Sequence, residues 1–293
     1  MASGGGGVDA TAAGDTPAAR ARADRQLAAL RQENQRLRNI LKIAHGAEPP
    51  PEQPVLLPPD PGVVTDASPP EAKLALYLRR FAARQDVYAH YWENRQKQTK
   101  GWSPVVRHRF RKGTLWDKQP LPLTADVVRA HLDRKDDLFI GLYPLMPDAT
   151  TWWLAADFDG PAAMLDAHAY AKAASSLGVP VALEISQSGR GVHAWTFFTA
   201  PVPAADARAM GTECIHRAMA LRGSMPLSSY DRLFPNQDTA PASASGVGNL
   251  IAAPLNGKRR YERRTTVFID MADWEPWPDQ WEYLSTLDSL TPR

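Results

Sequence analysis

Residues 152–160, WWLAADFDG, and residues 181–198, VALEISQSGRGVHAWTFF, carry the clearest structural pattern in the chain. The first run ends at Phe158 and is apolar enough to form a strand that is buried on both faces of a sheet. The Ala-rich segment over 161–177 predicts a helix that stops at a turn with glycine and proline. The second run has two apolar halves around SQSGRG, which predicts a β-hairpin.

Further elements extend this pattern on both sides. A second helix is expected from Pro203 to Leu221, because Gly223 suits the end of a helix. The order strand, helix, hairpin, helix, strand predicts an α+β domain with a mixed β-sheet and helices on one side. The remaining strands are expected at Leu138–Tyr143, Leu250–Leu255 and Thr266–Ile269.

The composition is that of an ordinary globular protein. The chain has 293 residues, a formal net charge of +2 and a single cysteine, Cys214. A nearly neutral charge does not indicate nucleic-acid binding by itself, and one cysteine excludes both an internal disulfide and a Cys-rich zinc site. No apolar run reaches the roughly 18–20 residues of a membrane helix, and the N-terminus lacks a signal-peptide core. We therefore expect a cytoplasmic protein without a membrane partner.

The N-terminal part predicts three segments before the main domain, which we expect over 69–293. Residues 1–22 lack periodicity, which is typical of a disordered tail. Residues 23–46 predict a short coiled-coil helix whose single seam asparagine favours a parallel homodimer, and the alternative is a lone amphipathic helix packed on the body. Residues 47–68 are rich in proline and predict a stiffened linker. The seam consists of Leu27, Leu30, Asn34, Leu37 and Leu41.

Asp157 and Asp159 stand at the end of the apolar strand. Because side chains two residues apart in a strand point to the same face, the two carboxylates are expected to project together. Such close like charges are unfavourable unless a cation neutralises them, and Mg²⁺ and Mn²⁺ prefer oxygen ligands. Two such ions clamp the attacking and leaving oxygens in phosphoryl transfer. The alternative is an ordinary surface or turn pair.

The turn SGRGVH, residues 188–193, is a candidate anion site. Glycines let backbone amides approach an anion closely. Ser188, Arg190 and His193 add a hydroxyl, a fixed cation and an imidazole donor, all of which suit a triphosphate. The alternative is a tight hairpin turn with a structural histidine.

Three other places are candidates that also have ordinary structural explanations. Asp231 is either a catalytic acid, a helix cap or a salt-bridge partner of Arg232. Lys258 and Arg259 follow a Gly-Asn-rich run and either lie on the solvated surface or contact phosphates or template. The stretch 88–116 interleaves aromatic and basic residues, which suits a nucleic-acid strand or an anchored surface loop.

The ordered set of motifs resembles the archaeo-eukaryotic primase superfamily, whose three signatures are Asp-x-Asp, a Ser…His motif and an apolar residue followed by Asp. SGRGVHAW is also similar to the phosphate-binding turn in polymerase domains of bacterial end-joining ligases. The resemblance is strongest to the primase-polymerase domain of TOTE conflict systems, found in bacterial mobile-element and defence contexts, and it covers roughly residues 70–290. The motifs in order are DFDG (157–160), SGRGVH (188–193), YD (230–231) and IAAPL (251–255).

The resemblance implies an RRM-like catalytic core and a template-dependent nucleotidyltransferase that uses NTP or dNTP. It places the third acid at Asp231 rather than Asp270, because that acid precedes the IAAPL-like strand and the basic turn, and Asp238 is a further competitor. It implies that two Mg²⁺ or Mn²⁺ ions bind to Asp157, Asp159 and Asp231. It implies that the nucleotide's phosphates contact Ser188, Arg190 and His193, with Lys258 or Arg259 as a lesser contact.

The chain departs from these relatives at one point. Many of them carry a four-cysteine zinc knuckle, whereas Gly101–Pro122 has no cysteine here, so we expect no zinc. Relatives also often continue into helicase or nuclease domains, which implies such a partner for a chain that stops at Arg293. The expected nucleic-acid partner is a single-stranded or primed template. The alternative functions are a catalytically silent nucleic-acid-binding module on the same fold and a two-metal nuclease.

Overall fold

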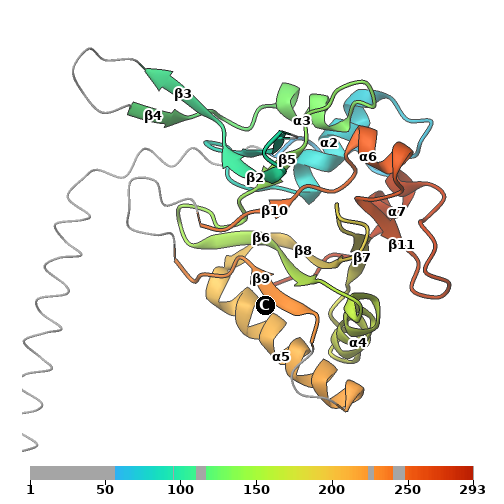
Figure 1. Cartoon of the computed structure of the whole chain (residues 1–293). Helices are drawn as coiled ribbons and strands as arrows, with labels where there is room; N and C mark the ends of the chain where they lie inside the picture. The colour runs from blue at the N-terminus through green and yellow to red at the C-terminus, as the bar shows by residue number, and fades with distance from the viewer. Residues whose placement is uncertain (1–56, 95, 110–116, 224–227, 240–247, 293) are drawn as a thin grey trace, which may run out of the picture. The chain divides into compact units, whose positions relative to one another are not determined.

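The computed structural model describes residues 57–292 except for residue 95 and the segments 110–116, 224–227 and 240–247 (Figure 1). The expected tail and coiled-coil helix, and the first part of the expected linker, lie outside the described residues. The last part of that linker packs on the body: Val64 is buried, and its backbone N–H donates to Ser285 Oγ at 3.1 Å. None of the helices in the described part is long and apolar enough to cross a membrane.

A five-stranded sheet forms the centre of the described unit, in the order β11-β7-β8-β6-β9. Its chain order is strand, helix, hairpin, helix, strand, so β8 lies between β6 and β7, and β6 lies between β8 and β9. This split β-α-β-β-α-β arrangement confirms the RRM-like core. The core consists of β6 (Thr150–Phe158), α4 (Ala163–Ser176), β7 (Ala182–Ile185), β8 (Val192–Pro203), α5 (Ala204–Arg222) and β9 (Tyr230–Phe234), with β11 (Val267–Ile269) beside β7.

The strand directions correct the expectation of a mixed sheet. Every ladder among the described strands is antiparallel. The physical reason is that each helical crossover skips one strand position, which leaves an antiparallel neighbour in the gap. Parallel pairing is confined, in the described part of the chain, to an isolated bridge between Phe198 and Leu290.

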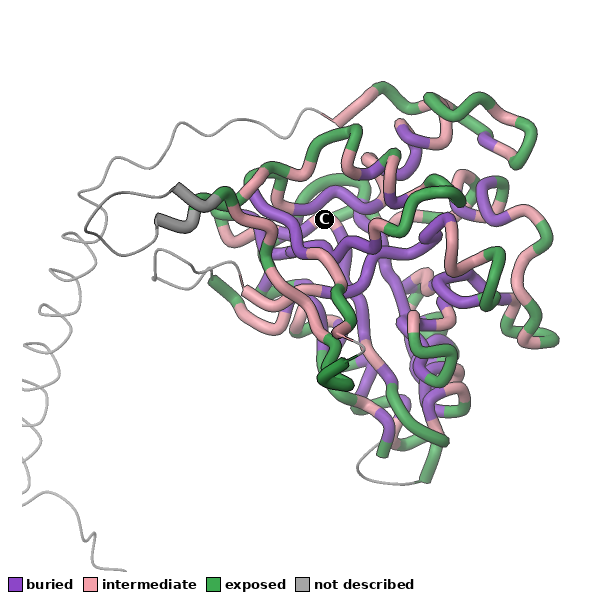
Figure 2. Tube along the Cα trace, turned by 45° about the horizontal axis from the view of Figure 1, so that its top comes forward, coloured by how far each residue is buried: buried purple, intermediate pink, exposed green. Residues whose placement is uncertain are grey.

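Alternation along β6 divides the core into two layers. Leu154, Ala156 and Phe158 face α4 and α5, which lie together on one side of the sheet (Figure 1). Trp153 and Ala155 face the opposite layer, where the helices α2 (Pro70–Arg80) and α7 (Gln280–Thr286) pack. Helices therefore cover both faces, not one as expected. In Figure 2 the buried parts of the trace run through the middle of the described unit, with exposed parts at its edges.

A second, four-stranded sheet has the order β10-β5-β1-β2. The strand expected at Leu250–Leu255 is reduced to β10 and joins this sheet instead of the RRM-like core. A two-stranded ribbon of β3 and β4 and two short helices complete the described unit. The bounds are β1 (Ala89–Asn94), β2 (Thr99–Pro104), β3 (Val106–Arg109), β4 (Asp117–Pro120), α3 (Ala125–Leu132), β5 (Ile140–Leu142), β10 (Ile251–Ala252) and α6 (Gly257–Glu262).

Candidate active site

Asp157 and Asp159 lie where β6 ends against the hairpin of β7 and β8. Asp157 is the penultimate residue of the strand, and its side chain is 15% exposed. Asp159 follows the strand and is exposed, and its backbone N–H donates to Ser229 O at 2.7 Å. The two acids therefore sit at one end of the sheet, where a buried strand reaches the surface.

Asp231 reaches the same end of the sheet through an irregularity in β9. Asp157 pairs with Arg232 and Phe158 pairs with Tyr230, so Asp231 is an extra residue between two paired ones. Such a bulge redirects the side chain of the unpaired residue. The Asp231 carboxylate accepts a hydrogen bond from Arg232 Nε at 2.7 Å.

The three carboxylates act on one another electrostatically. Burial raises the pKa of Asp157 above its usual value, and the nearby charges of Asp159 and Asp231 raise it further. His193 and Arg232 oppose this shift in the pKa because they are cations. Asp238 and Asp270, the competitors for the third acid, are not among the charges that act on Asp157. Asp238 pairs with Arg208, and Asp270 caps a turn at Ala272.

A row of four charged side chains, one of which is Asp157, crosses the sheet. The ladder registers align Glu184 with His193, His193 with Asp157, and Asp157 with Arg232. Carboxylate, imidazole, carboxylate and guanidinium therefore alternate over β7, β8, β6 and β9. Glu184 was not among the site residues predicted from the sequence, although a lone glutamate within the apolar run VALEI was a signal.

His193 lies between two carboxylates in this row. Its Nδ1 is 2.9 Å from Glu184 Oε2, and its Nε2 is 3.6 Å from Asp157 Oδ1. Burial alone would lower the pKa of His193, but the charges of Glu184, Asp157 and Asp159 outweigh burial and raise it to about 9. The ring is therefore an imidazolium at neutral pH, held inside the sheet rather than in the turn before it.

The SGRG turn contacts the acids through its backbone. Ser188 Oγ accepts hydrogen bonds from the N–H groups of Arg190 and Gly191, at 3.1 and 3.2 Å, and so stabilises the turn itself. A Cβ on Gly191 would collide with Asp159 Oδ1 and lie 2.9 Å from Phe158 O. Gly191 thus allows the turn to approach Asp159, while the Arg190 side chain remains exposed.

Lys258 and Arg259 belong to a different part of the molecule. Lys258 Nζ forms an ion pair with Asp137 at 2.9 Å. The Arg259 guanidinium lies over the rings of Tyr91 and Phe139, at 5.0 and 4.5 Å from their centroids. The structure therefore associates both residues with the four-stranded sheet, and their contacts are not with the three acids.

The β1–β2 hairpin carries part of the aromatic and basic stretch. Trp92 pairs with Gly101 across the hairpin, and its indole Nε1 donates to Ser103 Oγ at 2.9 Å. Glycine leaves room there, since a Cβ would lie 3.2 Å from the Trp92 ring. This hydrogen bond holds the ring against the hairpin, and 36% of the residue is exposed. Residues 110–116 of this stretch lie outside the described part.

The three acids suit a divalent metal by their chemistry. Carboxylate oxygens are the ligands that Mg²⁺ and Mn²⁺ prefer, and burial, followed by the charges of Asp159 and Asp231, disfavours the ionised form of Asp157 and raises its pKa. Within the described residues, no three His, Cys, Asp or Glu side chains are already grouped as a metal site.

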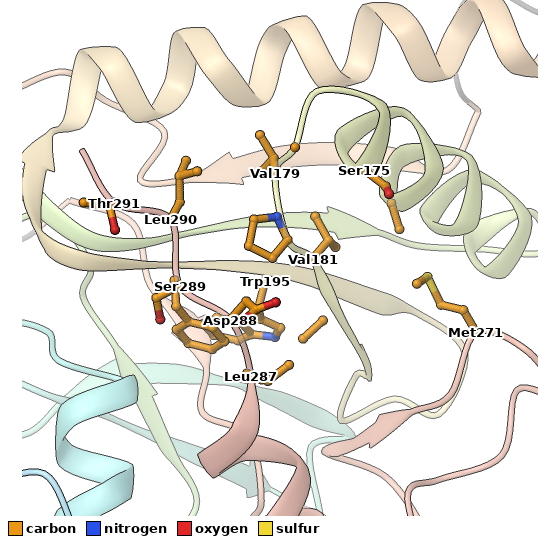
Figure 3. Close-up of a pocket in the computed structure, with 15 residues that line it drawn as sticks. Ser175, Val179, Val181, Trp195, Met271, Leu287, Asp288, Ser289, Leu290 and Thr291 are labelled. Carbon is orange, nitrogen blue, oxygen red and sulfur yellow. The ribbon is translucent and has the colours of Figure 1, made fainter. Parts of the chain in front are cut away.

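A pocket of about 530 Å³ lies away from the acids (Figure 3). It lies between the start of β7 and the C-terminal segment, and Val179, Val181 and Leu290 are among the residues that line it. Trp195 lines this cavity and also donates from Nε1 to Glu184 Oε2 at 2.7 Å. The cavity thus shares one residue with the surroundings of the charged row and contains none of the predicted site residues.

Comparison with known proteins gives three findings. Residues 72–293 match the family described as TOTE conflict system, Archaeo-Eukaryotic Primase domain. A search of curated proteins finds no match. Among solved structures, the polymerase domain of ligase D from Mycobacterium tuberculosis in complex with DNA is similar at 17% sequence identity and a TM-score of 0.37, over 82% of this chain and 92% of that chain.

Proposed function

Because the chain belongs to the archaeo-eukaryotic primase domain family of TOTE conflict systems, we propose that it is a template-dependent nucleotidyltransferase. It would start or extend a nucleic-acid strand from NTP or dNTP on a single-stranded or primed template. The observation that carries this proposal is the gathering of Asp157, Asp159 and Asp231 at one end of the RRM-like sheet, where their charges raise the pKa of a buried carboxyl.

The three acids would hold the metal ions of this reaction, Mg²⁺ or Mn²⁺. When bound, two such ions neutralise phosphoryl charge and polarise the attacking and leaving oxygens. The chain's own contribution is the unmatched negative charge of the acids, on a strand whose position is fixed by neighbours on both edges. A rigid sheet keeps these groups in place, and positioning of this kind supplies most of the catalysis in phosphoryl transfer.

The groups around the acids would bind the anionic part of the nucleotide. His193 is an imidazolium whose Nε2 faces Asp157, so it can donate to a phosphate oxygen. Arg190 projects into solvent from the turn that touches Asp159 and offers a mobile cation. Ser188 would act mainly by holding that turn in shape. Lys258 and Arg259 would contact the template rather than the triphosphate, because they lie with the four-stranded sheet.

The test is a reaction with single-stranded template, labelled nucleotide and Mg²⁺ or Mn²⁺, first without and then with a primer. The Asp157→Asn/Asp159→Asn double variant serves as the control, since it removes two charges at nearly constant volume. Product from the parent alone without a primer supports a primase, and product only with a primer supports a polymerase. An equal yield from parent and double variant would contradict the assignment of the acids.

One observation favours a second candidate, a catalytically silent nucleic-acid-binding module. No metal-binding group of three side chains is already assembled among the described residues. This candidate predicts template binding by the parent, unchanged by the double variant, with no product under either condition. Degradation of a labelled strand without added nucleotide would instead indicate a nuclease.

A further inference from the structure

Glu184 is a charged residue in the centre of the apolar strand β7. Its exposed fraction is 0%, and its Oε2 accepts two hydrogen bonds, from His193 Nδ1 at 2.9 Å and Trp195 Nε1 at 2.7 Å. Its other oxygen, Oε1, has no partner among the described residues. A buried carboxylate costs free energy unless it is paired and fully hydrogen-bonded. Packing therefore does not explain why glutamate occupies this position.

A second buried carboxylate shows what a purely structural role looks like. Asp166 is 1% exposed, and both of its oxygens are paired. Its Oδ1 accepts from Arg222 Nε at 2.8 Å, and its Oδ2 accepts from Ser229 Oγ at 2.6 Å. Glu184 differs because one oxygen makes all its contacts, and both donors come from the same face of β8.

The contacts of His193 show which of its two neighbouring carboxylates fixes the ring. A carboxylate only accepts, so Nδ1 carries the proton in the contact with Glu184. The 3.6 Å between Nε2 and Asp157 Oδ1 is too long for a hydrogen bond, and Nε2 makes no hydrogen bond within the described part of the chain. Glu184 therefore holds the ring, while Nε2 remains available beside the acids.

We propose that Glu184 is a positioning residue, which holds the His193 ring by Nδ1 so that Nε2 donates to a phosphate of the nucleotide beside Asp157. This inference rests on the proposed function and specifies how the same site orients its substrate. Trp195 supports the arrangement, because its Nε1 donates a hydrogen bond to the same Glu184 oxygen that accepts from His193 Nδ1. Partners that orient a functional side chain in this way are often as critical as the side chain itself, and their loss costs about 10–100-fold.

The experiment is a double-mutant cycle of Glu184→Gln and His193→Gln, with nucleotide KM and kcat measured on a primed template. Glutamine keeps the volume of Glu184 and an acceptor oxygen but removes the negative charge, so the hydrogen bond from His193 Nδ1 is no longer made to a carboxylate. We expect Glu184→Gln to lower kcat/KM about tenfold or more, chiefly by raising the nucleotide KM. In the His193→Gln background the same change should alter kcat/KM by less than about twofold, because the ring that Glu184 holds is gone.

Tyr77→Phe is the matched structural control. It removes one buried hydrogen bond, from the Tyr77 hydroxyl to Pro254 O at 2.9 Å, in the same core cluster as Trp195 but without a hydrogen bond to Glu184, His193 or Asp157 among the described residues. It should leave kcat/KM unchanged. An equal loss from Glu184→Gln in both His193 backgrounds would assign Glu184 to stability alone and would overturn the proposal.

A second readout does not depend on activity. In the parent labelled with ¹⁵N-histidine, the His193 ring should show a hydrogen-bonded Nδ1 proton far downfield, assigned by its loss in His193→Gln. A ring without that proton would overturn the proposal. If the proton is present and the parent makes no product, the proposed function fails while the orientation of the ring by Glu184 stands.

Discussion

The structure buries two histidines in opposite charge states. His193 lies in the RRM-like sheet between Glu184 and Asp157, and its pKa is raised to about 9. His131 lies in α3 against the four-stranded sheet, and burial lowers its pKa to about 4. Both side chains are almost completely removed from solvent. Burial alone therefore does not decide the charge of a histidine, and the neighbouring groups do.

The partners of His131 explain the difference. Its Nε2 lies 2.9 Å from Pro254 O and therefore donates, while Nδ1 accepts from the Ile140 N–H at 3.4 Å and lies 3.3 Å from Asn256 Nδ2. A neutral ring satisfies all three contacts, and a proton on Nδ1 would face two donors. The neutral His131 thus stabilises the fold. The charged His193 instead lies beside the carboxylates of Glu184, Asp157 and Asp159.

The strongest way to break this comparison is to remove the charge that His193 faces. Asp157→Asn should lower nucleotide incorporation by more than about 10²-fold, because it removes an acid at nearly constant volume. The measurement is initial rate on a primed template, together with the melting temperature. The control is Asp136→Asn, an exposed carboxylate that caps Leu138 near the neutral histidine. A variant Asp157→Asn that keeps parent activity would refute its place in the site.

Replacing each histidine by glutamine should separate activity from stability. His193→Gln should raise the nucleotide KM about tenfold, because it removes a phosphate donor next to the acids. His131→Gln should leave KM unchanged but lower the free energy of unfolding by about 1–3 kcal/mol, because buried partners lose their hydrogen bonds. Urea titration and steady-state kinetics on both variants test this. The contrast would be wrong if the two variants changed KM equally.

The pH dependence of stability should differ in sign between the two sites. The folded pKa of His131 is about 4, below the value of about 6.5 in an unfolded chain, so its contribution is full above pH 6.5 and is lost as the pH falls through 4. The folded pKa of His193 is about 9, so its contribution is full below pH 6.5 and is lost as the pH rises through 9.

Melting temperatures between pH 4 and pH 10, measured in a metal chelator, check both contributions. The charges that face His193 are Glu184, Asp157 and Asp159, and those that face His131 are Arg259 and Arg260. Relative to the parent, His131→Gln should flatten the acid side of the profile and His193→Gln the alkaline side. The reverse assignment would contradict the charge states described above.

The smallest expected effect comes from Tyr77→Phe. Its hydroxyl donates to the same oxygen, Pro254 O, that His131 contacts. Loss of this bond should cost about 1 kcal/mol of stability, since His131 still satisfies the acceptor. Calorimetry should therefore show a lower melting temperature with unchanged kinetics. A loss as large as that of His131→Gln would mean that the two donors are coupled.

The local pattern of the sequence predicted most of the core. Periodicity identified β6, α4, the hairpin and α5, because each segment buries one face or two at regular spacing. It did not reveal strand neighbours: the antiparallel ladders and the placement of Leu250–Leu255 in another sheet depend on long-range pairing. Asp157 and Asp159 were identified as a pair, and the resemblance supplied Asp231.

The row of charged side chains could not be predicted from the sequence, for a physical reason. Glu184 matters only because β8 brings His193 opposite it and Trp195, two residues on, within hydrogen-bond distance, and a register between strands is not encoded in either strand alone. Ser188, Arg190 and His193 were likewise predicted from the sequence to act together in one turn. In the structure Ser188 holds the turn, Arg190 projects outward, and His193 belongs to the sheet.

The order of the strands in the central sheet also affects when the acids come together during folding. Asp157 pairs with His193 of β8 and with Arg232 of β9. β8 follows α4 in the chain and β9 follows α5, so both pairings join segments that are separated by a helix. Contacts between such distant segments form late in folding, after the local helices and the hairpin. A nascent chain that has not yet emerged beyond β9 therefore has no gathered acids, so the acid-bearing end of the sheet forms after the scaffold that carries it.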